Sequence, residues 1–153
     1  MKKRIYTDTS VIGGCFDDEF KKGSRALFNM FRSELATIVI SNLTLAELEN
    51  APEPVQNILK EIPDTSIEYI NLTEEAKELA NNYLNEKVVS NKFIVDAQHI
   101  AIATVNRVDV LVSWNFKHIV NLKRIYSYNS INLKMGYPIL EIRNPLEVIN
   151  YED

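Results

Sequence analysis

Two short runs of apolar and β-branched residues most constrain the fold of this chain. They are Thr37-Ile38-Val39-Ile40 and Val110-Leu111-Val112, and neither alternates with charged residues. Strands with one face in water alternate apolar and polar residues, whereas strands of a parallel sheet covered on both faces are continuously apolar. The two runs therefore predict inner strands of a largely parallel sheet.

Further strand-like runs alternate with helical patterns along the chain. The expected strands cover 4–7, 36–40, 66–70, 108–113 and 139–142, and the expected helices cover 24–34, 43–50, 55–61, 74–87 and 94–107. Pro52 and Pro63 mark helix ends, because the residue before a proline avoids the helical region. Thr73 is typical of a helix N-cap. This alternation indicates an α/β fold with a central, mostly parallel sheet of four to five strands flanked by helices.

The bulk properties of the chain fit one cytoplasmic domain. Its 153 residues, 46% of them apolar, are enough for one core, so we expect a single domain over residues 1–153. The one cysteine, Cys15, excludes an intrachain disulfide and suits a reducing compartment. Because no signal-peptide core or membrane-length apolar run is present, we expect a soluble cytoplasmic protein without a membrane partner.

The charge of the chain bears on its binding partners. A net charge of −4, from 17 basic and 21 acidic residues, argues against tight non-specific binding of nucleic acid. It does not exclude an enzyme that contacts a polyanion locally through metal ions. Basic residues gather at 2–4, 21–22, 117–118 and 123–124, where ordinary solvated surfaces explain them equally well.

Asp8 is the most unusually placed acidic residue, because it leaves the end of the first expected strand beside two hydroxyl residues, Thr9 and Ser10. Ligands of open α/β sheets bind outside the carboxyl ends of the strands. A carboxylate there is badly placed for packing and well placed to hold a hard cation or a phosphate. Asp8 is therefore a candidate catalytic residue and metal ligand, and Thr9 and Ser10 are candidates for positioning water or substrate.

Two further acids lie in the first turns of helices. Glu47 follows the second expected strand and shares a helix face with Leu43, although a surface glutamate is the commoner case. Asp96 opens the most apolar helix, where stabilisation of the helix N-terminus alone could explain it. The functional interpretation makes both residues metal ligands that face Asp8, with Glu49 as an alternative to Glu47.

Polar residues also follow the inner strand Val110-Leu111-Val112. Ser113, Asn115 and Lys117 leave its end in the same way that Asp8 leaves the first strand. Asn115 can supply a neutral oxygen ligand or hydrogen-bond a metal-bound water. Ser113 and Lys117 are candidates for positioning water or phosphate, although a solvated turn explains Lys117 equally well.

Carboxylates gathered at one edge of a sheet need a counter-charge. Two unit charges about 4 Å apart repel each other by roughly 4 kcal/mol at an effective dielectric constant of about 20. Mg²⁺ and Mn²⁺ take oxygen ligands, keep several waters, and can activate a water against a phosphodiester. Asp8, Glu47, Asp96 and Asn115 therefore predict a site for Mg²⁺ or Mn²⁺.

These segments resemble the PIN domain, the nuclease fold of VapC-type toxins of toxin–antitoxin systems. Asp8-Thr9-Ser10 matches the family's Asp-x-Ser/Asn step after the first strand, and Thr44-Leu45-Ala46-Glu47-Leu48 matches its glutamate-bearing helix. Asp96-Ala97-Gln98-His99-Ile100-Ala101 matches the third acid at the start of an alanine-rich helix, and 113–118 holds the fourth position. The four motifs occur in the family's order over most of the chain.

The resemblance implies a three-layer α/β sandwich and a Mg²⁺- or Mn²⁺-dependent endoribonuclease that hydrolyses RNA phosphodiester bonds. It also implies a homodimer and a small antitoxin protein as partner. The catalytic and metal-binding residues would be Asp8, Glu47, Asp96 and Asn115. Because the family's fourth position is often Asp, Asn115 removes one charge and puts a strict two-metal mechanism in doubt.

Two other functions are compatible with these residues. Asn115 and the acidic composition also suit a catalytically weak PIN-like module that binds RNA or a protein. A phosphotransferase or phosphatase with Asp8 as nucleophile is disfavoured, because Ser10 stands where an Asp-x-Asp motif has its second acid.

Three residues with reactive or aromatic side chains are expected to have no catalytic role. Cys15 is expected to pack in the interior, and Trp114 is expected to pack in the core or at a dimer face. His99 lies three residues after Asp96 and could approach the site, but the commoner case is an exposed histidine. Nothing in the sequence orients a histidine beside Cys15, as a catalytic pair would require.

Overall fold

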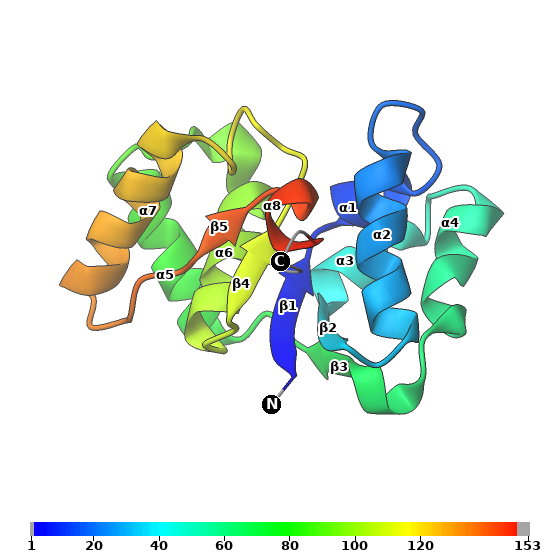
Figure 1. The fold of residues 1–153 in the computed structure, drawn as a ribbon. Coiled ribbons are helices and arrows are strands. Elements are labelled where there is room, and N and C mark those ends of the chain that lie inside the picture. Colours follow the sequence, from blue (N-terminus) through cyan, green and yellow to red (C-terminus); the bar gives the residue numbers. More distant parts are fainter. Residues whose placement is uncertain (1, 150–153) are drawn as a thin grey trace.

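The computed structural model describes residues 2–149 as a five-stranded parallel sheet between two layers of helices (Figure 1). The spatial order of the strands is β3-β2-β1-β4-β5, and every neighbouring pair is parallel. The strands are β1 (Lys3–Thr7), β2 (Ala36–Ser41), β3 (Ile67–Ile70), β4 (Val110–Val112) and β5 (Ile142–Arg143). Met1 and residues 150–153 of the expected domain lie outside the described residues.

The connections between the strands are largely helical. The α-helices are α1 (Thr9–Gly14), α2 (Lys21–Arg32), α3 (Asn42–Leu48), α4 (Glu53–Asn57), α5 (Glu74–Asn85), α6 (Ile94–Val105), α7 (Leu122–Lys134) and α8 (Pro145–Ile149). Short 3₁₀-helices cover Ile58–Glu61, Asp64–Ser66 and Asn91–Phe93. None of the helices in the described part of the chain is both long and apolar enough to cross a membrane.

Alternate residues of the strands point into separate cores on the two faces of the sheet. Tyr6 of β1 and Leu111 of β4 belong to the core formed with α5, α6 and α7. Ile5 and Val110, their neighbours in sequence, belong to the core formed with α1, α2 and α8. Because helices cover both faces, the continuously apolar runs of β2 and β4 are explained. The predicted three-layer α/β architecture is confirmed.

The connectivity of the sheet reverses at β1. From β1 the chain continues to β2 and β3 on one side, and it returns to β4 and β5 on the other. In β1 and β4, Thr7 and Val112 are paired, so the residues that follow them leave the sheet at the same edge. Open parallel sheets bind ligands at such a switch point, outside the carboxyl ends of the strands. Asp8 and Ser113 are these following residues.

Three helices end two residues earlier than the sequence pattern predicts, all for the same reason. Glu34, Lys87 and Arg107, the predicted last residues, have left-handed backbones with φ values of 63°, 60° and 52°. After each of them, the next backbone N–H donates to the carbonyl five residues before it, as in a helix C-cap. A left-handed residue cannot continue a right-handed helix, so α2, α5 and α6 end before it.

The sequence patterns missed three helices, α1, α7 and α8. Asp8 starts α1 by accepting a hydrogen bond from the Val11 N–H at 3.4 Å, in a segment whose two glycines suggested an irregular exit. In α7, the large apolar residues Leu122, Tyr126 and Leu133 are exposed. Its hydrophobic pattern therefore does not mark a single buried face, and this hid the helix.

Other element boundaries agree more closely with the predictions. Thr73 caps α5 by accepting a hydrogen bond from the Ala76 N–H at 3.2 Å, as expected. The expected helix 55–61 is divided between α4 and a 3₁₀ turn. The last strand is placed too early in the prediction, because β5 begins only at Ile142.

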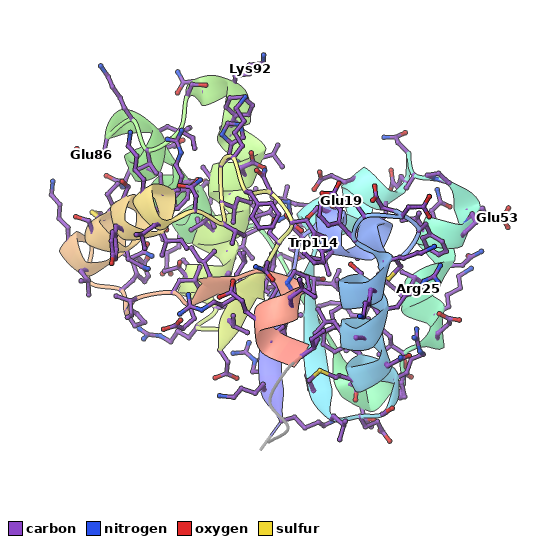
Figure 2. All side chains as sticks on the ribbon, turned by 45° about the horizontal axis from the view of Figure 1, so that its top comes forward. Glu19, Arg25, Glu53, Glu86, Lys92 and Trp114 are labelled. Atoms are coloured by element: carbon purple, nitrogen blue, oxygen red, sulfur yellow. The ribbon has the colours of Figure 1, made fainter. Side chains whose placement is uncertain are left out.

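Trp114 fixes the segment after β4 against α1 and α2, near the centre of the molecule (Figure 2). The indole N–H donates to Ser24 Oγ at 2.9 Å, and the Ser24 hydroxyl donates to the Val11 carbonyl at 2.7 Å. The indole also stacks on Phe20, with ring centroids 4.5 Å apart. Trp114 is 8% exposed, so it has the packing role expected of it. This packing anchors the backbone that carries Ser113 and Asn115.

Gly14→Ala tests the close approach of Trp114 to α1. A Cβ atom at Gly14 would lie 2.5 Å from Ser24 Oγ and 2.8 Å from Trp114 Nε1. We therefore expect the free energy of unfolding, measured by urea denaturation, to fall by about 1–3 kcal/mol. Gly13→Ala is the matched control, because a Cβ there meets nothing within 4 Å and alanine favours the helix. Equal effects of the two substitutions would contradict this packing.

Candidate active site

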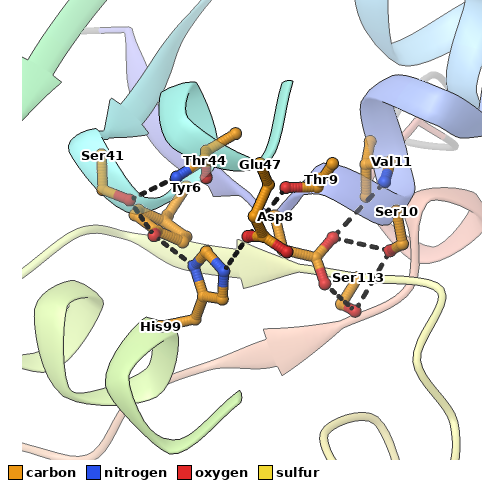
Figure 3. Close-up of polar contacts among 10 residues, drawn as sticks. All are labelled: Tyr6, Asp8, Thr9, Ser10, Val11, Ser41, Thr44, Glu47, His99 and Ser113. Carbon is orange, nitrogen blue, oxygen red and sulfur yellow. Dashed lines mark hydrogen bonds and ion pairs between the residues drawn. The ribbon is translucent and has the colours of Figure 1, made fainter. Parts of the chain in front are cut away.

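The four predicted ligands lie at the carboxyl edge of the sheet. Asp8 follows β1, Glu47 lies in α3, Asp96 lies in the first turn of α6, and Asn115 follows β4. The Asp8 charge acts on Asp96, and the Asn115 side chain favours the charged form of Asp96. The Thr9 hydroxyl, next to Asp8, donates to Glu47 Oε1 at 3.0 Å (Figure 3). The site therefore has a central group of Asp8, Asp96 and Asn115, with Glu47 attached beside it.

Asp8 accepts more hydrogen bonds than the other carboxylates of the site. The hydroxyl groups of Ser10 and Ser113 donate to its two oxygens, each at 2.6 Å (Figure 3). Each serine oxygen in turn accepts a backbone N–H: Ser10 Oγ from Trp114 at 3.0 Å, and Ser113 Oγ from Asn115 at 2.9 Å. Because both hydroxyls are oriented by the backbone, Asp8 accepts two short, charge-assisted hydrogen bonds and has little rotational freedom.

Burial dominates the electrostatics of Asp8. The residue is 5% exposed, and this burial raises the pKa of Asp8 above its ordinary value. The nearby His99 and the two serine hydroxyls favour the charged form, and they offset only part of the desolvation. A carboxylate held at the edge of a core in this way gains from a positive partner.

Asp96 and Asn115 face each other across the ends of α6 and β4. Burial raises the pKa of Asp96, and the Asp8 charge raises it further, whereas His118 and the hydrogen bond to Asn115 oppose the shift. The Asn115 Oδ1 atom accepts the backbone N–H of His118 at 2.9 Å. Asn115 adds no charge beside Asp96, whereas an aspartate at this position would repel it.

Glu47 is held apart from the central pair of acids. Its Oε1 atom accepts hydrogen bonds from Thr9 and from His99 Nε2, the latter at 2.9 Å (Figure 3). The bond from His99 is the main reason that the pKa of Glu47 is lowered, against an opposing effect of partial burial. Glu49, the alternative ligand, is an exposed residue just after α3. These contacts favour Glu47 over Glu49.

His99 is the site residue that the sequence interpretation misjudged. It is 2% exposed, and its ring joins Glu47 to the hydroxyl group of Tyr6, so the expectation of an exposed histidine is wrong. The available signal was its spacing: three residues after Asp96, one helical turn further along α6. Cys15 is buried and packs in the core with α1 and α2, as expected.

The residues predicted to position water or phosphate divide into two kinds. Thr9, Ser10 and Ser113 use their hydroxyl protons to hold carboxylates, so in this structure they orient the acids. Lys117 is exposed, in the turn after Asn115, and its charge acts on His118. Its ammonium group is thus available to an anion that approaches the site.

The donor set suits a hard divalent cation. Within residues 2–149, no three histidine, cysteine, aspartate or glutamate side chains are grouped closely enough to hold a metal ion together. The central donors are two carboxylates, Asp8 and Asp96, with the neutral Asn115. Mg²⁺ is commonly bound through one or two carboxylates and waters, and a cation would relieve the repulsion between these acids. Metal ligation by Asp8, Glu47, Asp96 and Asn115 stays a prediction.

Comparison with known proteins identifies the fold. No protein-family model matches the chain, and no curated protein matches it in sequence. The solved structure of Mycobacterium tuberculosis VapC20, a sarcin–ricin loop cleaving toxin, matches with a TM-score of 0.55 and 16% identity, over 74% of this chain and 92% of that chain.

Two further solved structures cover more of the chain. VapBC2 from Rickettsia felis, bound to a DNA fragment from its promoter, matches with a TM-score of 0.56 and 17% identity, over 91% of this chain and 98% of that chain. FitAcB from Neisseria gonorrhoeae matches with a TM-score of 0.57 and 14% identity, over 94% and 99% of the two chains. The chain thus has the PIN-domain fold of VapC-type toxins, as the resemblance implied.

The raised pKa of Asp8 predicts how stability depends on pH. Folded Asp8 keeps its proton to a higher pH than unfolded Asp8, whose pKa is about 4. Its contribution to stability is therefore complete below that value and is lost as the pH rises through the folded-state pKa. Asp8→Asn removes this dependence, so we expect the stability of the variant relative to the wild type to increase with pH.

Urea denaturation in chelator-containing buffers across the acidic and neutral range measures this effect. Asp18→Asn is the control, because the Asp18 side chain is fully exposed. Its stability is expected to run parallel to that of the wild type at every pH. A parallel course for Asp8→Asn as well would show that burial does not raise the pKa of Asp8 in the folded protein.

Proposed function

We propose that this chain is a Mg²⁺- or Mn²⁺-dependent endoribonuclease that hydrolyses RNA phosphodiester bonds. The observation that carries the proposal is the pair of repelling carboxylates at the switch point of the sheet, the buried Asp8 and the half-buried Asp96. The fold adds support, since one protein that shares it is a toxin that cleaves the sarcin–ricin loop. At 16% identity this likeness supports the fold, and the site residues support the chemistry.

Asp8 and Asp96 are the residues that would hold the cation, with Glu47 and Asn115 completing the set of ligands. A bound Mg²⁺ or Mn²⁺ would supply an activated water and would stabilise charge that develops on the phosphate. Ser10 and Ser113 keep Asp8 in one orientation. Preorganised ligands of this kind reduce the reorganisation that a reaction requires.

Cationic side chains near Asp96 would receive the RNA backbone. Lys117 is exposed, and the charges of Lys117 and Arg124 both act on His118, whose backbone N–H holds Asn115. His118 itself is stacked on Phe93, with ring centroids 3.7 Å apart, and burial lowers its pKa. Lys117 and Arg124 would therefore be the local contacts to phosphate. Their positive charge would compensate for the acidic composition of the chain as a whole.

We also propose a biological context of the kind found for proteins of this fold. One solved neighbour is a toxin–antitoxin complex from Klebsiella pneumoniae, with 14% identity over 78% of this chain and a TM-score of 0.54. By analogy, this chain would be the cytoplasmic toxin of such a pair, a homodimer that a small antitoxin inhibits. Co-purification with the product of an adjacent small reading frame would test the pairing.

Cleavage of RNA is the direct test of the proposed activity. The purified wild type is expected to cleave structured RNA when Mg²⁺ or Mn²⁺ is added and to stop when a chelator is added. Asp8→Asn and Asp96→Asn are each expected to lower kcat by at least about 100-fold, because each removes a charge that holds the cation. Gel-based cleavage assays measure these rates.

Asp18→Asn serves as the matched control for these substitutions, because it makes the same chemical change on a fully exposed side chain. Wild-type rates in Asp8→Asn or Asp96→Asn would exclude this site. If the wild type shows neither Mn²⁺ affinity in calorimetry nor cleavage of varied RNAs, the chain is instead the binding module that Asn115 suggested.

Asn115→Asp tests the effect of the missing charge. The new carboxylate can still accept the His118 N–H, but its charge repels Asp96. We expect the Kd for Mn²⁺ in calorimetry to fall about tenfold, because affinity for hard cations rises with the charge of the ligands. We also expect a lower melting temperature in chelator. Unchanged Mn²⁺ affinity would place Asn115 outside the metal site.

A further inference from the structure

A continuous chain of hydrogen bonds runs beneath the candidate site, from β2 to α3. The Tyr6 hydroxyl lies 2.7 Å from Ser41 Oγ and 2.6 Å from His99 Nδ1 (Figure 3). On the other side of the ring, His99 Nε2 lies 2.9 Å from Glu47 Oε1. Tyr6 and Ser41 are fully buried. Water therefore does not supply alternative partners to these groups, and they must satisfy one another.

The contact with Glu47 shows which nitrogen of His99 carries the proton in this arrangement. A carboxylate oxygen can only accept, so a bare Nε2 at 2.9 Å from Oε1 would bring two acceptors together. Nε2 must therefore carry a proton and donate it to Glu47. In the neutral ring the other nitrogen, Nδ1, is then an acceptor.

The direction of the remaining bonds follows from Nδ1. Tyr6 has one hydroxyl proton, and donating it to Nδ1 satisfies that nitrogen. The Tyr6 oxygen can then accept the Ser41 proton, while Ser41 Oγ accepts the Thr44 N–H at 3.4 Å, at the start of α3. With this direction every donor in the chain has an acceptor, from the cap of α3 through the core and back to Glu47 on the same helix.

We propose that Tyr6 is a positioning residue: by donating to Nδ1 it fixes His99 as the Nε2–H tautomer, and His99 in turn holds Glu47 at the metal site. Its effect on catalysis rests on the proposed nuclease function, whereas the tautomer does not. Tyr6 itself touches neither substrate nor metal. Tyr6 lies on β1, two residues before Asp8. The same strand therefore leads into Asp8 and supports Glu47 through His99.

The hydrogen bonds leave one oxygen of Glu47 free for a ligand. His99 and Thr9 both donate to Oε1, whereas Oε2 has no hydrogen-bond partner among the described residues. In Figure 3 the Glu47 carboxylate lies between the His99 ring and Asp8. A glutamate on a helix surface samples many rotamers, and fixing one oxygen lowers the entropic cost of presenting the other. Loss of the Tyr6 hydroxyl would leave Nδ1 unpaired and release this arrangement.

Nitrogen NMR of the metal-free protein measures the tautomer directly. The sequence has two histidines, His99 and His118, so long-range ¹H–¹⁵N spectra of labelled protein contain two ring systems. A His99→Gln spectrum assigns them. In mildly alkaline buffer, where an ordinary imidazole is neutral, we expect a protonated-type shift for Nε2 and an unprotonated-type shift for Nδ1 of His99. An Nδ1–H tautomer or a doubly protonated ring in the wild type would overturn the proposal.

Tyr6→Phe removes the hydroxyl group alone, and Tyr83→Phe is its matched control. Tyr83 is a buried tyrosine of the same core, but its hydroxyl donates to Asn132, away from the site. Tyr6→Phe is expected to change the His99 nitrogen shifts toward a mixture of tautomers, and Tyr83→Phe is expected to leave them unchanged. Identical His99 spectra in Tyr6→Phe and the wild type would contradict the role of Tyr6. The wild-type spectrum remains decisive even if Tyr6→Phe does not fold.

The kinetic consequence separates this inference from the proposed function. Tyr6→Phe is expected to lower kcat for RNA cleavage about tenfold with little change in KM, as for loss of a group that orients a metal ligand. Tyr83→Phe is expected to retain wild-type kcat. If the wild type shows the expected His99 tautomer but cleaves no RNA, the nuclease proposal is overturned. The proposed direction of the hydrogen bonds is not affected by that result. Wild-type kcat in Tyr6→Phe would overturn the positioning role.

Discussion

The structure depends most on the contact that joins Asp8 to the end of β4. Ser113 donates to one oxygen of Asp8, and Ser10 donates to the other. The two donors come from different segments, so the carboxylate ties β1, α1 and the loop after β4 into one unit. A carboxylate with 5% exposure is costly unless it is paired or hydrogen-bonded. The hydroxyl groups reduce that cost without removing it, and the excess is what makes the position suitable for a cation.

The packing of Trp114 shows how the fold keeps this contact in place. Its backbone N–H donates to Ser10 Oγ, while its indole N–H donates to Ser24. One residue therefore links the polar site to the apolar layer formed by α1 and α2. The small residues Gly14 and Gly23 make room for the ring, since a Cβ at either would lie under 3.0 Å from it. The geometry of the acids thus depends on close packing several residues away from them.

More of the fold than of the candidate site could be predicted from the sequence. Continuously apolar runs gave the inner strands, because coverage on both faces leaves no need for polar alternation. The exact helix ends could not be predicted from the sequence. The helices end before Glu34, Lys87 and Arg107, which have left-handed backbones, and a left-handed backbone is usually predicted only at glycine. The acids could be found from their positions after strands. The burial of His99 could not, because it depends on Tyr6 and Glu47, which are distant in sequence and meet only after the sheet forms.

The distribution of charge in the site bears on how many cations it suits. Asp8 and Asp96 together carry the charge that one divalent ion neutralises. Asn115 adds no charge and favours the charged form of Asp96, which reduces the need for a second ion there. The charge of Glu47 is stabilised separately, by hydrogen bonds from His99 and Thr9. Two of the three acids thus need an external counter-charge, whereas the third is supported from within the protein. For the metal site proposed above, this balance suits one divalent cation better than two.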